Sequence, residues 1–231
     1  MEKKELRPAV VFHYFDEVCQ VPRPSKKEEK IRAYLLDFAK KHNLEAKTDE
    51  AGNVLIKKAA SAGMENLKTV ILQSHIDMVC EKNKDTEHNF ETDPIQTYID
   101  GEWLRAKGTT LGADNGIGVA TELAVLASDD IKHGPIECLF TVDEETGLTG
   151  AFALKEGFMN GDILLNLDSE DDGELFIGCA GGANTTAIYP FPTEKAPQGW
   201  FFFRVSVKGL TGGHSGDDIS KNRANANKLL N

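Results

Sequence analysis

A hydrophobic segment that ends in a histidine and an aspartate most constrains the fold of this chain. Residues 69–72, Thr-Val-Ile-Leu, predict a buried strand, which continues through Ser74 into His75-Ile76-Asp77. Because side chains alternate between the two faces of a strand, His75 and Asp77 are expected to point to the same side. A neutral imidazole with a carboxylate two residues further along suits a metal ligand and its carboxylate neighbour.

Other segments bring acids to comparable positions. Strands predicted at 135–142 and 162–168 lead into Glu144-Glu145 and Asp168, and Asp114 lies in a glycine-rich loop, 108–118, before a helix predicted at 119–128. Strands and helices alternate over the first 180 or so residues, which predicts an α/β layered fold. Sites in such sheets gather outside the carboxyl ends of the strands, so these acids are expected to meet His75.

The remaining elements divide the chain into two domains. Helices are predicted at 8–20 and from Ser25, where Glu28 would complete a capping box. Hairpins are predicted at 45–57 and 98–104, a short helix at 150–156 and a strand at 174–179. Two β-patterned runs, 185–189 and 200–208, follow, separated by a proline-rich stretch. The expected domains are therefore 1–184 and 185–231, and the second is expected to be incomplete because residues 217–231 start a helix without an end signal.

Charge and composition exclude several kinds of partner. The formal net charge of −11 argues against nucleic acid, which needs a clustered basic face. No apolar run approaches the ~18 residues of a membrane-spanning helix, and the polar N-terminus lacks a signal-peptide core, so no membrane partner is expected. The four cysteines form no CxxC pair, which favours reduced thiols in a cytoplasmic protein.

Each candidate residue also has a structural explanation on its own. His75 would then be a satisfied core histidine, Asp114 a helix cap, Glu144-Glu145 a solvated turn and Asp168 part of the acidic loop 168–172. Their combination favours a metal site, because apolar strands that repeatedly end in charge need those charges paired or metal-bound. Imidazole with carboxylates suits zinc, with manganese or cobalt as alternatives. Two such ions would share a bridging water of pKa ~7, and one of the adjacent glutamates would move its proton.

The sequence does not support three other kinds of site: a calcium-binding EF-hand, a nucleotide-binding loop and a serine triad. Residues 168–173 resemble the start of an EF-hand loop, but its twelfth position is Cys179 rather than glutamate. The loop 112–118 has neither the dinucleotide-binding nor the P-loop spacing, and Asp114 would repel phosphate. No G-x-S-x-G sequence is present, so a serine triad has no support.

Four motifs, in order, resemble those of the dinuclear-zinc exopeptidases, the family of the aminoacylases, carboxypeptidase G and the dipeptidases. They are Ser74-His-Ile-Asp77, Gly112-Ala-Asp-Asn-Gly116, Glu144-Glu-Thr-Gly147 and Asn166-Leu-Asp-Ser-Glu170. The sequence around His75 and Asp114 is similar to that of the Xaa-His dipeptidase branch in particular. The resemblance covers essentially the whole chain and implies a mixed sheet flanked by helices, followed by the beginning of an α+β lid domain.

The resemblance also implies a role for each residue. His75 and Asp168 would be zinc ligands, Asp114 would bridge both ions, and Glu145 would be a further ligand. Glu144 would be the general base, and Asp77 would orient His75. His214, in Gly212-Gly-His-Ser-Gly216, would hold the substrate carbonyl or its oxyanion. The family's last zinc ligand is a histidine near the end of a chain about twice as long, so this chain is expected to be an N-terminal fragment, and the resemblance leaves open whether it is active alone.

The leading hypothesis is therefore hydrolysis of dipeptides, of Xaa-His type or more broadly, by a water that bridges two divalent ions. One alternative is an N-acyl-amino-acid deacylase that uses the same site. Another is a non-catalytic metal or peptide binder. The resemblance further implies a homodimer formed through the lid domain in the full-length protein.

Overall fold

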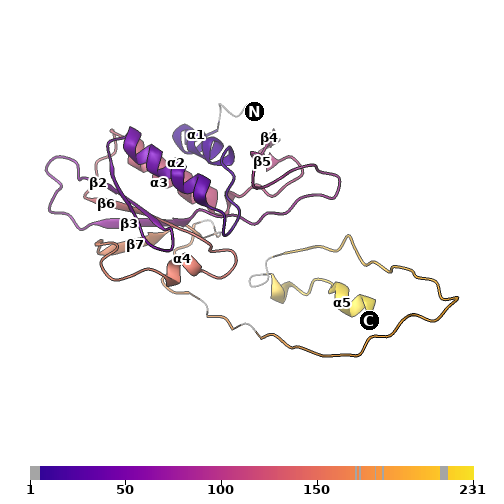
Figure 1. Ribbon diagram of the computed structural model, residues 1–231. Helices are drawn as coiled ribbons and strands as arrows, with labels where there is room; N and C mark the ends of the chain where they lie inside the picture. The colour runs from indigo at the N-terminus through magenta and orange to yellow at the C-terminus, as the bar shows by residue number, and fades with distance from the viewer. Residues whose placement is uncertain (1–5, 170, 172, 180, 184, 214–217) are drawn as a thin grey trace. The chain divides into compact units, whose positions relative to one another are not determined.

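The computed structural model describes residues 6–169, 171, 173–179, 181–183, 185–213 and 218–231. The chain forms two compact units, Met1–Ile177 and Gly178–Asn231. The first unit holds the sheet and its helices (Figure 1).

A five-stranded mixed sheet is the centre of the first unit. Its strands are β1 (Glu45–Thr48), β2 (Val54–Lys58), β3 (Val70–His75), β6 (Ile136–Thr141) and β7 (Ile163–Asn166), in the spatial order β1-β2-β6-β3-β7. β3 runs parallel to both of its neighbours, whereas β2 is antiparallel to β1 and to β6. The predicted α/β fold with a mixed sheet is confirmed.

The parallel part of the sheet determines where the acids that follow the strands lie. In the register of β3 against β6, His75 lies opposite Thr141, so both strands end at the same edge. On the other side of β3, Gln73 pairs with Asn166 at the end of β7. The segments that follow β6 and β7 therefore emerge beside His75.

Three helices cover one face of this sheet: α1 (Ala9–Cys19), α2 (Glu29–Lys41) and α3 (Ala113–Ala127) (Figure 1). The apolar stripe of α1 is buried through Phe15 and Val18, and the stripe of α2 through Ile31 and Leu35. α3 is apolar on most sides and packs between α1 and β3. Both N-terminal helices occur as the periodicity predicts.

The other face of the sheet is covered by the chain after α4 (Thr149–Phe152), a shorter helix than the one predicted at 150–156. Leu55, Ile71 and Leu139 point to this face, while their strand neighbours point into the main core. Their partners come from the segment before β7: Leu154, Phe158 and Met159. Figure 1 shows α4 on the side of the sheet opposite α2.

Two local predictions are wrong. The capping box at Ser25 does not form, because α2 begins only at Glu29 and the Ser25 hydroxyl donates instead to Asp77. The strand predicted at 174–179 is not formed by residues 174–179, all of which are described. The hairpin predicted at 98–104 is present as β4 (Thr97–Asp100) and β5 (Trp103–Ala106).

The second unit contains a short 3-10 turn, η2 (Ile219–Lys221), and a helix, α5 (Ala226–Leu230). The β-patterned runs 185–189 and 200–208 have no strand partner in the part of the chain that the structure describes. The domain boundary at 184/185 stays a prediction. Among the described residues, no helix combines the length and apolarity needed to cross a bilayer.

Candidate metal centre

His75 lies at the end of β3 with its side chain buried and acids on both ring nitrogens. Nε2 is 2.8 Å from Oδ1 of Asp114 and 3.6 Å from Oδ1 of Asp168. Glu144 Oε2 is 3.9 Å from the same nitrogen. Nδ1 lies 3.3 Å from Oδ1 of Asp77, without the alignment of a full hydrogen bond. The ring therefore faces three carboxylates at one nitrogen and a fourth at the other.

Asp77 is fully buried and connects His75 to the loop after β6. Its Oδ1 accepts a hydrogen bond from the backbone N–H of Glu144 at 3.0 Å, and its Oδ2 accepts one from Glu145 at 3.2 Å. The Ser25 hydroxyl donates a further bond to Oδ2 at 2.7 Å. Burial opposes ionisation of Asp77, but these donors and His75 outweigh it and lower its pKa to about 2. Asp77 thus stays a carboxylate that lies against the imidazole and holds the backbone of the glutamate pair.

Asp114 and Asn115 lie where the first turn of α3 is interrupted. Both residues have non-helical backbone angles, and the peptide bond between them is cis. Asp114 turns its partly exposed carboxylate toward His75. Asn115 is buried, and its Nδ2 donates to Oδ1 of Asp168 at 2.8 Å while its Oδ1 accepts from the backbone N–H of Gly118. The interrupted turn therefore supplies one acid and positions another.

Glu144 and Glu145 follow β6 and face the same region. Burial raises the pKa of Glu144, the charge of His75 lowers it, and the surrounding carboxylates raise it further. Burial likewise raises the pKa of Glu145, with Asp114 as the next cause. A carboxylate whose pKa lies above its ordinary value is a better proton acceptor, as a general base requires.

The donor set fits divalent cations. Ligand atoms of His75, Asp114 and Asp168 lie within 4.8 Å of one another, and so do those of His75, Glu144 and Glu145. Donors bound at about 2.0–2.2 Å to a tetrahedral ion lie about 3.3 Å apart, close to the spacings around Nε2. Burial alone would lower the pKa of His75, yet the neighbouring carboxylates of Asp114, Asp168 and Asp77 raise it to about 12. The acids thus favour positive charge at this position, which metal ions would supply.

Asp77 also belongs to a second group of acids, which is buried. Glu28, Asp77 and Asp143 are all buried, with carboxylate oxygens within 4.8 Å of one another. Glu28 accepts the backbone N–H groups of Lys26 and Asp143, and the Thr146 hydroxyl donates to Asp143 at 2.6 Å. Since protein donors already satisfy these acids, they support the glutamate loop.

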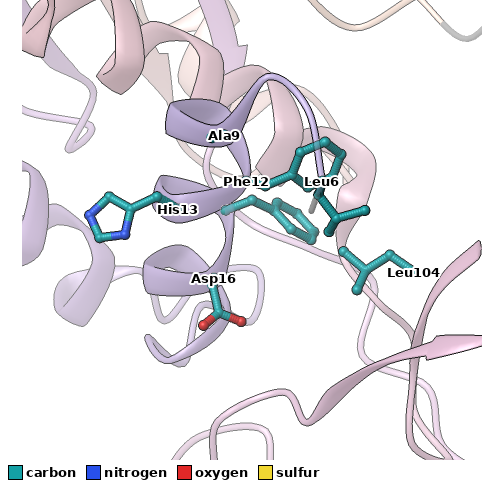
Figure 2. Close-up of a pocket in the computed structure, with 7 residues that line it drawn as sticks. Leu6, Ala9, Phe12, His13, Asp16 and Leu104 are labelled. Carbon is teal, nitrogen blue, oxygen red and sulfur yellow. The ribbon is translucent and has the colours of Figure 1, made fainter. Parts of the chain in front are cut away.

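A pocket beside α1 is separate from this centre. Figure 2 shows the side chains that line it, which come from the start of the chain, from α1 and from β5: Leu6, Ala9, Phe12, His13, Phe15, Asp16 and Leu104. Most of them are apolar, and the His13 ring points away from the apolar side chains in this view. None of the acids around His75 lines the pocket, so it has no part in the metal centre.

The structure thus brings six of the seven predicted site residues together: His75, Asp77, Asp114, Glu144, Glu145 and Asp168. The seventh, His214, lies outside the described residues. Sequence reasoning missed Ser25 and the buried Arg23, and it assigned no role to Asn115. Asn115 had a usable signal, because a polar residue beside a predicted ligand is a candidate for orienting another.

Comparisons with known proteins identify the relatives of this chain. The model of peptidase family M20/M25/M40 matches residues 71–214. The cytosol non-specific dipeptidase of Escherichia coli is 50% identical over 229 residues, which is 99% of this chain and 47% of that protein. The crystal structure of aminoacylhistidine dipeptidase from Vibrio alginolyticus, also 50% identical, covers 100% of this chain with a TM-score of 0.76, and 47% of its own chain is matched.

A more distant structure, the aminopeptidase PepT from Bacillus cereus, is 26% identical over 70% of this chain and 43% of its own, with a TM-score of 0.60. This chain therefore spans about half the length of the E. coli and Vibrio relatives. The family match covers more than half of the chain and includes all of the acids that surround His75. The chain belongs to peptidase family M20/M25/M40.

Proposed function

We propose that this chain carries the metal-binding and proton-transfer residues of a metal-dependent dipeptidase. The observation that supports this most directly is the convergence of one imidazole and four carboxylates at the carboxyl edge of the parallel strands. The names of the E. coli and Vibrio relatives favour dipeptides, with a C-terminal histidine as one accepted residue. The whole protein would then hydrolyse the peptide bond of Xaa-His and related dipeptides.

We assign the ligands by position. His75, Asp114 and Asp168 form one potential ligand group, and Glu145 shares a second with His75 and Glu144. Asp114 has the most exposed of these carboxylates and lies nearest to Nε2 of His75, which suits a bridging ligand. Mixed nitrogen and oxygen donors favour zinc, with manganese and cobalt as alternatives. The chemistry that a pair of such ions supplies is the acidification of a bound water and the polarisation of the substrate carbonyl.

The chain's own residues would carry the protons and hold the geometry. Glu144, with its raised pKa, would accept the proton of the attacking water and return it to the leaving amine. Asp77 would fix the backbone of the glutamate pair through its two hydrogen bonds and would keep His75 oriented through its contact with Nδ1 at 3.3 Å. His214 is proposed to stabilise the oxyanion of the substrate.

Hydrolysis of an Xaa-His dipeptide tests the proposal. The assay is made with this chain alone and with this chain joined to the C-terminal half of the E. coli relative. The activity of the joined protein should disappear with chelator and return with zinc. Glu144→Gln should lower kcat by about 10²–10⁴-fold with bound metal unchanged. The exposed Glu102, in the β4–β5 turn, provides the control Glu102→Gln. Full turnover in chelator would disprove the proposal.

The same measurements separate the alternatives. A deacylase would hydrolyse an N-acetyl amino acid faster than a dipeptide, so the two rates are compared side by side. A non-catalytic binder would take up metal and dipeptide without turnover in either form of the protein. A cytoplasmic location, in line with the name of the E. coli relative, completes the proposal, together with a homodimer that the full-length protein forms through the lid domain that residues 185–231 begin.

A further inference from the structure

Arg23 is a buried cation to which the reaction as proposed gives no role. It lies between Pro22 and Pro24, after α1, and only 2% of its surface is exposed. Arginine keeps its charge in proteins, and a buried guanidinium is stable only where its N–H groups find acceptors. The acceptors of Arg23 therefore show which segments of the chain its buried side chain holds together.

Those acceptors belong to two segments that carry predicted ligands. Nη1 donates to the backbone carbonyls of Ile76 at 3.2 Å and Asp77 at 2.9 Å, in the segment directly after His75. Nη2 donates to the carbonyl of Gly112 at 2.5 Å, two residues before Asp114. A guanidinium is planar, so the separation of its N–H groups is fixed. One rigid group thus spans the two segments that face each other across the His75–Asp114 contact.

The space around the guanidinium is shaped to hold it. Gly112 has φ of 68°, and a Cβ there would lie 2.5 Å from Nη2 of Arg23 and 2.8 Å from Sδ of Met78. A Cβ at Gly116 would lie 2.7 Å from the same nitrogen. Pro24 also pairs with Met78 through a backbone bridge, which keeps Arg23 beside the segment after β3. Both glycines of the Gly112-Ala-Asp-Asn-Gly116 motif are therefore needed to accommodate this side chain.

We propose that Arg23 is a positioning residue that sets the distance between His75 and Asp114 and thereby the affinity of the site for divalent metal. Its role in metal binding rests on the proposed function, whereas its effect on the His75–Asp114 contact does not. Its charge adds to the effect, since it lies close enough to Asp77 and Asp114 to interact with both. A lysine at this position would keep the charge, but its single ammonium group would not span both segments.

The test compares Arg23→Lys and Arg23→Met with the unchanged 231-residue chain. Zinc affinity is measured by competition with a chromophoric chelator, and cobalt(II) absorption reports the ligand geometry. Removal of a group that orients ligands weakens metal binding by about 10–100-fold. We expect a loss in this range for Arg23→Lys, a larger one for Arg23→Met, and an altered cobalt spectrum for both.

Lys58→Met is the matched control. The Lys58 ammonium also donates to two backbone carbonyls of α3 and its end, those of Val125 and Ser128, but at the opposite end of the helix from Asp114. This variant should lower the melting temperature and leave zinc affinity unchanged. Equal loss of zinc affinity in Lys58→Met and Arg23→Lys would mean that Arg23 acts only through stability and would overturn the proposal.

A second readout needs no metal. The ¹⁵N chemical shifts of the His75 ring report its contact with Asp114, and Asp114→Ala supplies the reference for a lost contact. The Arg23→Lys signal should move toward that reference. An unmoved signal would overturn the proposal for Arg23, whereas failure of the unchanged chain to bind zinc would count against the proposed metal site instead.

Discussion

The side-chain amide of Asn115 donates a 2.8 Å hydrogen bond to the carboxylate of Asp168, which joins the first turn of α3 to the end of β7. These two residues are 53 positions apart in the chain. The same oxygen, Oδ1 of Asp168, lies 3.6 Å from Nε2 of His75. Asn115 therefore acts on Asp168 as a group that orients a ligand.

Asn115→Ala should weaken zinc binding by about 10-fold, as is usual when a ligand loses the group that orients it. It should also lower the free energy of unfolding by about 1–3 kcal/mol, because the backbone N–H of Gly118 loses its acceptor. Chelator competition and urea titration measure the two effects. Asn83, whose side chain is exposed, gives the control Asn83→Ala. Unchanged zinc affinity would show that Asp168 does not depend on Asn115.

The stability of the chain should fall with rising pH through Glu28. Burial raises the pKa of this carboxyl, while the backbone N–H groups of Lys26 and Asp143 lower it in part. A raised folded-state pKa means that the folded chain binds the proton more tightly than the unfolded chain. The stabilisation is therefore complete below the unfolded value of 4.5 and is lost as pH rises through the higher folded value.

Glu28→Gln removes this dependence, because the amide oxygen still accepts both N–H groups without a buried charge beside Asp77. We expect Glu28→Gln to equal or exceed the unchanged chain in stability at pH 8 and to lose its advantage near pH 4. Thermal melts over this pH range, with Glu102→Gln as the control, decide the matter. If the Glu28→Gln chain were less stable than the unchanged chain at pH 8, the buried charge of Glu28 would not be destabilising and the prediction would be wrong.

The strand ends were predictable because two local signals coincide there. An apolar run fixes the strand, and the rule that parallel strands end together places His75, Glu144 and Asp168 at one edge. Periodicity also located α1 and α2. The helices and strands that position the site in the first unit are therefore largely predictable from local sequence patterns.

Contacts between distant segments could not be predicted, because they leave no local pattern in the sequence. Ser25 has the spacing of a helix cap, yet its hydroxyl binds Asp77, 52 residues away, and the helix starts at Glu29. Arg23 lies between two prolines in a stretch that only marks the end of a helix. The runs 185–189 and 200–208 have strand composition, but a strand also needs a partner, which no local pattern specifies.

Ser25→Ala should therefore change the ionisation of Asp77 and leave the start of α2 intact. Loss of a hydrogen bond to a charged acceptor costs about 1.5–3 kcal/mol, and here the acceptor is buried. The pKa of Asp77, now about 2, should rise, because one of the donors that lower it is gone. NMR titration of the Asp77 carboxyl measures this rise. If Ser25 were instead a helix cap, the carboxyl titration would be unmoved and the amide protection of residues 29–32 would fall.

Asn53 should be among the most sensitive positions for stability. Its side chain is fully buried, and Nδ2 donates to Asp49 at 2.7 Å and to the carbonyl of Gly150 at 2.8 Å. Its Oδ1 accepts the backbone N–H of Val142 at 3.1 Å, at the start of the segment that carries Glu144. The amide thus ties the β1–β2 turn to both ends of the glutamate loop.

Asn53→Ala leaves the Gly150 carbonyl and the Val142 N–H buried without their side-chain partner, so we expect a loss of about 2–4 kcal/mol in the free energy of unfolding. Asn53→Asp is the matched variant, since it keeps the acceptor for Val142 but replaces the donor with a charge facing Asp49. It should be at least as destabilising at pH 7 and recover near pH 4, where a protonated carboxyl can donate again. Urea titrations at both pH values test this, and equal stability of Asn53→Asp at the two would refute the role of the donor.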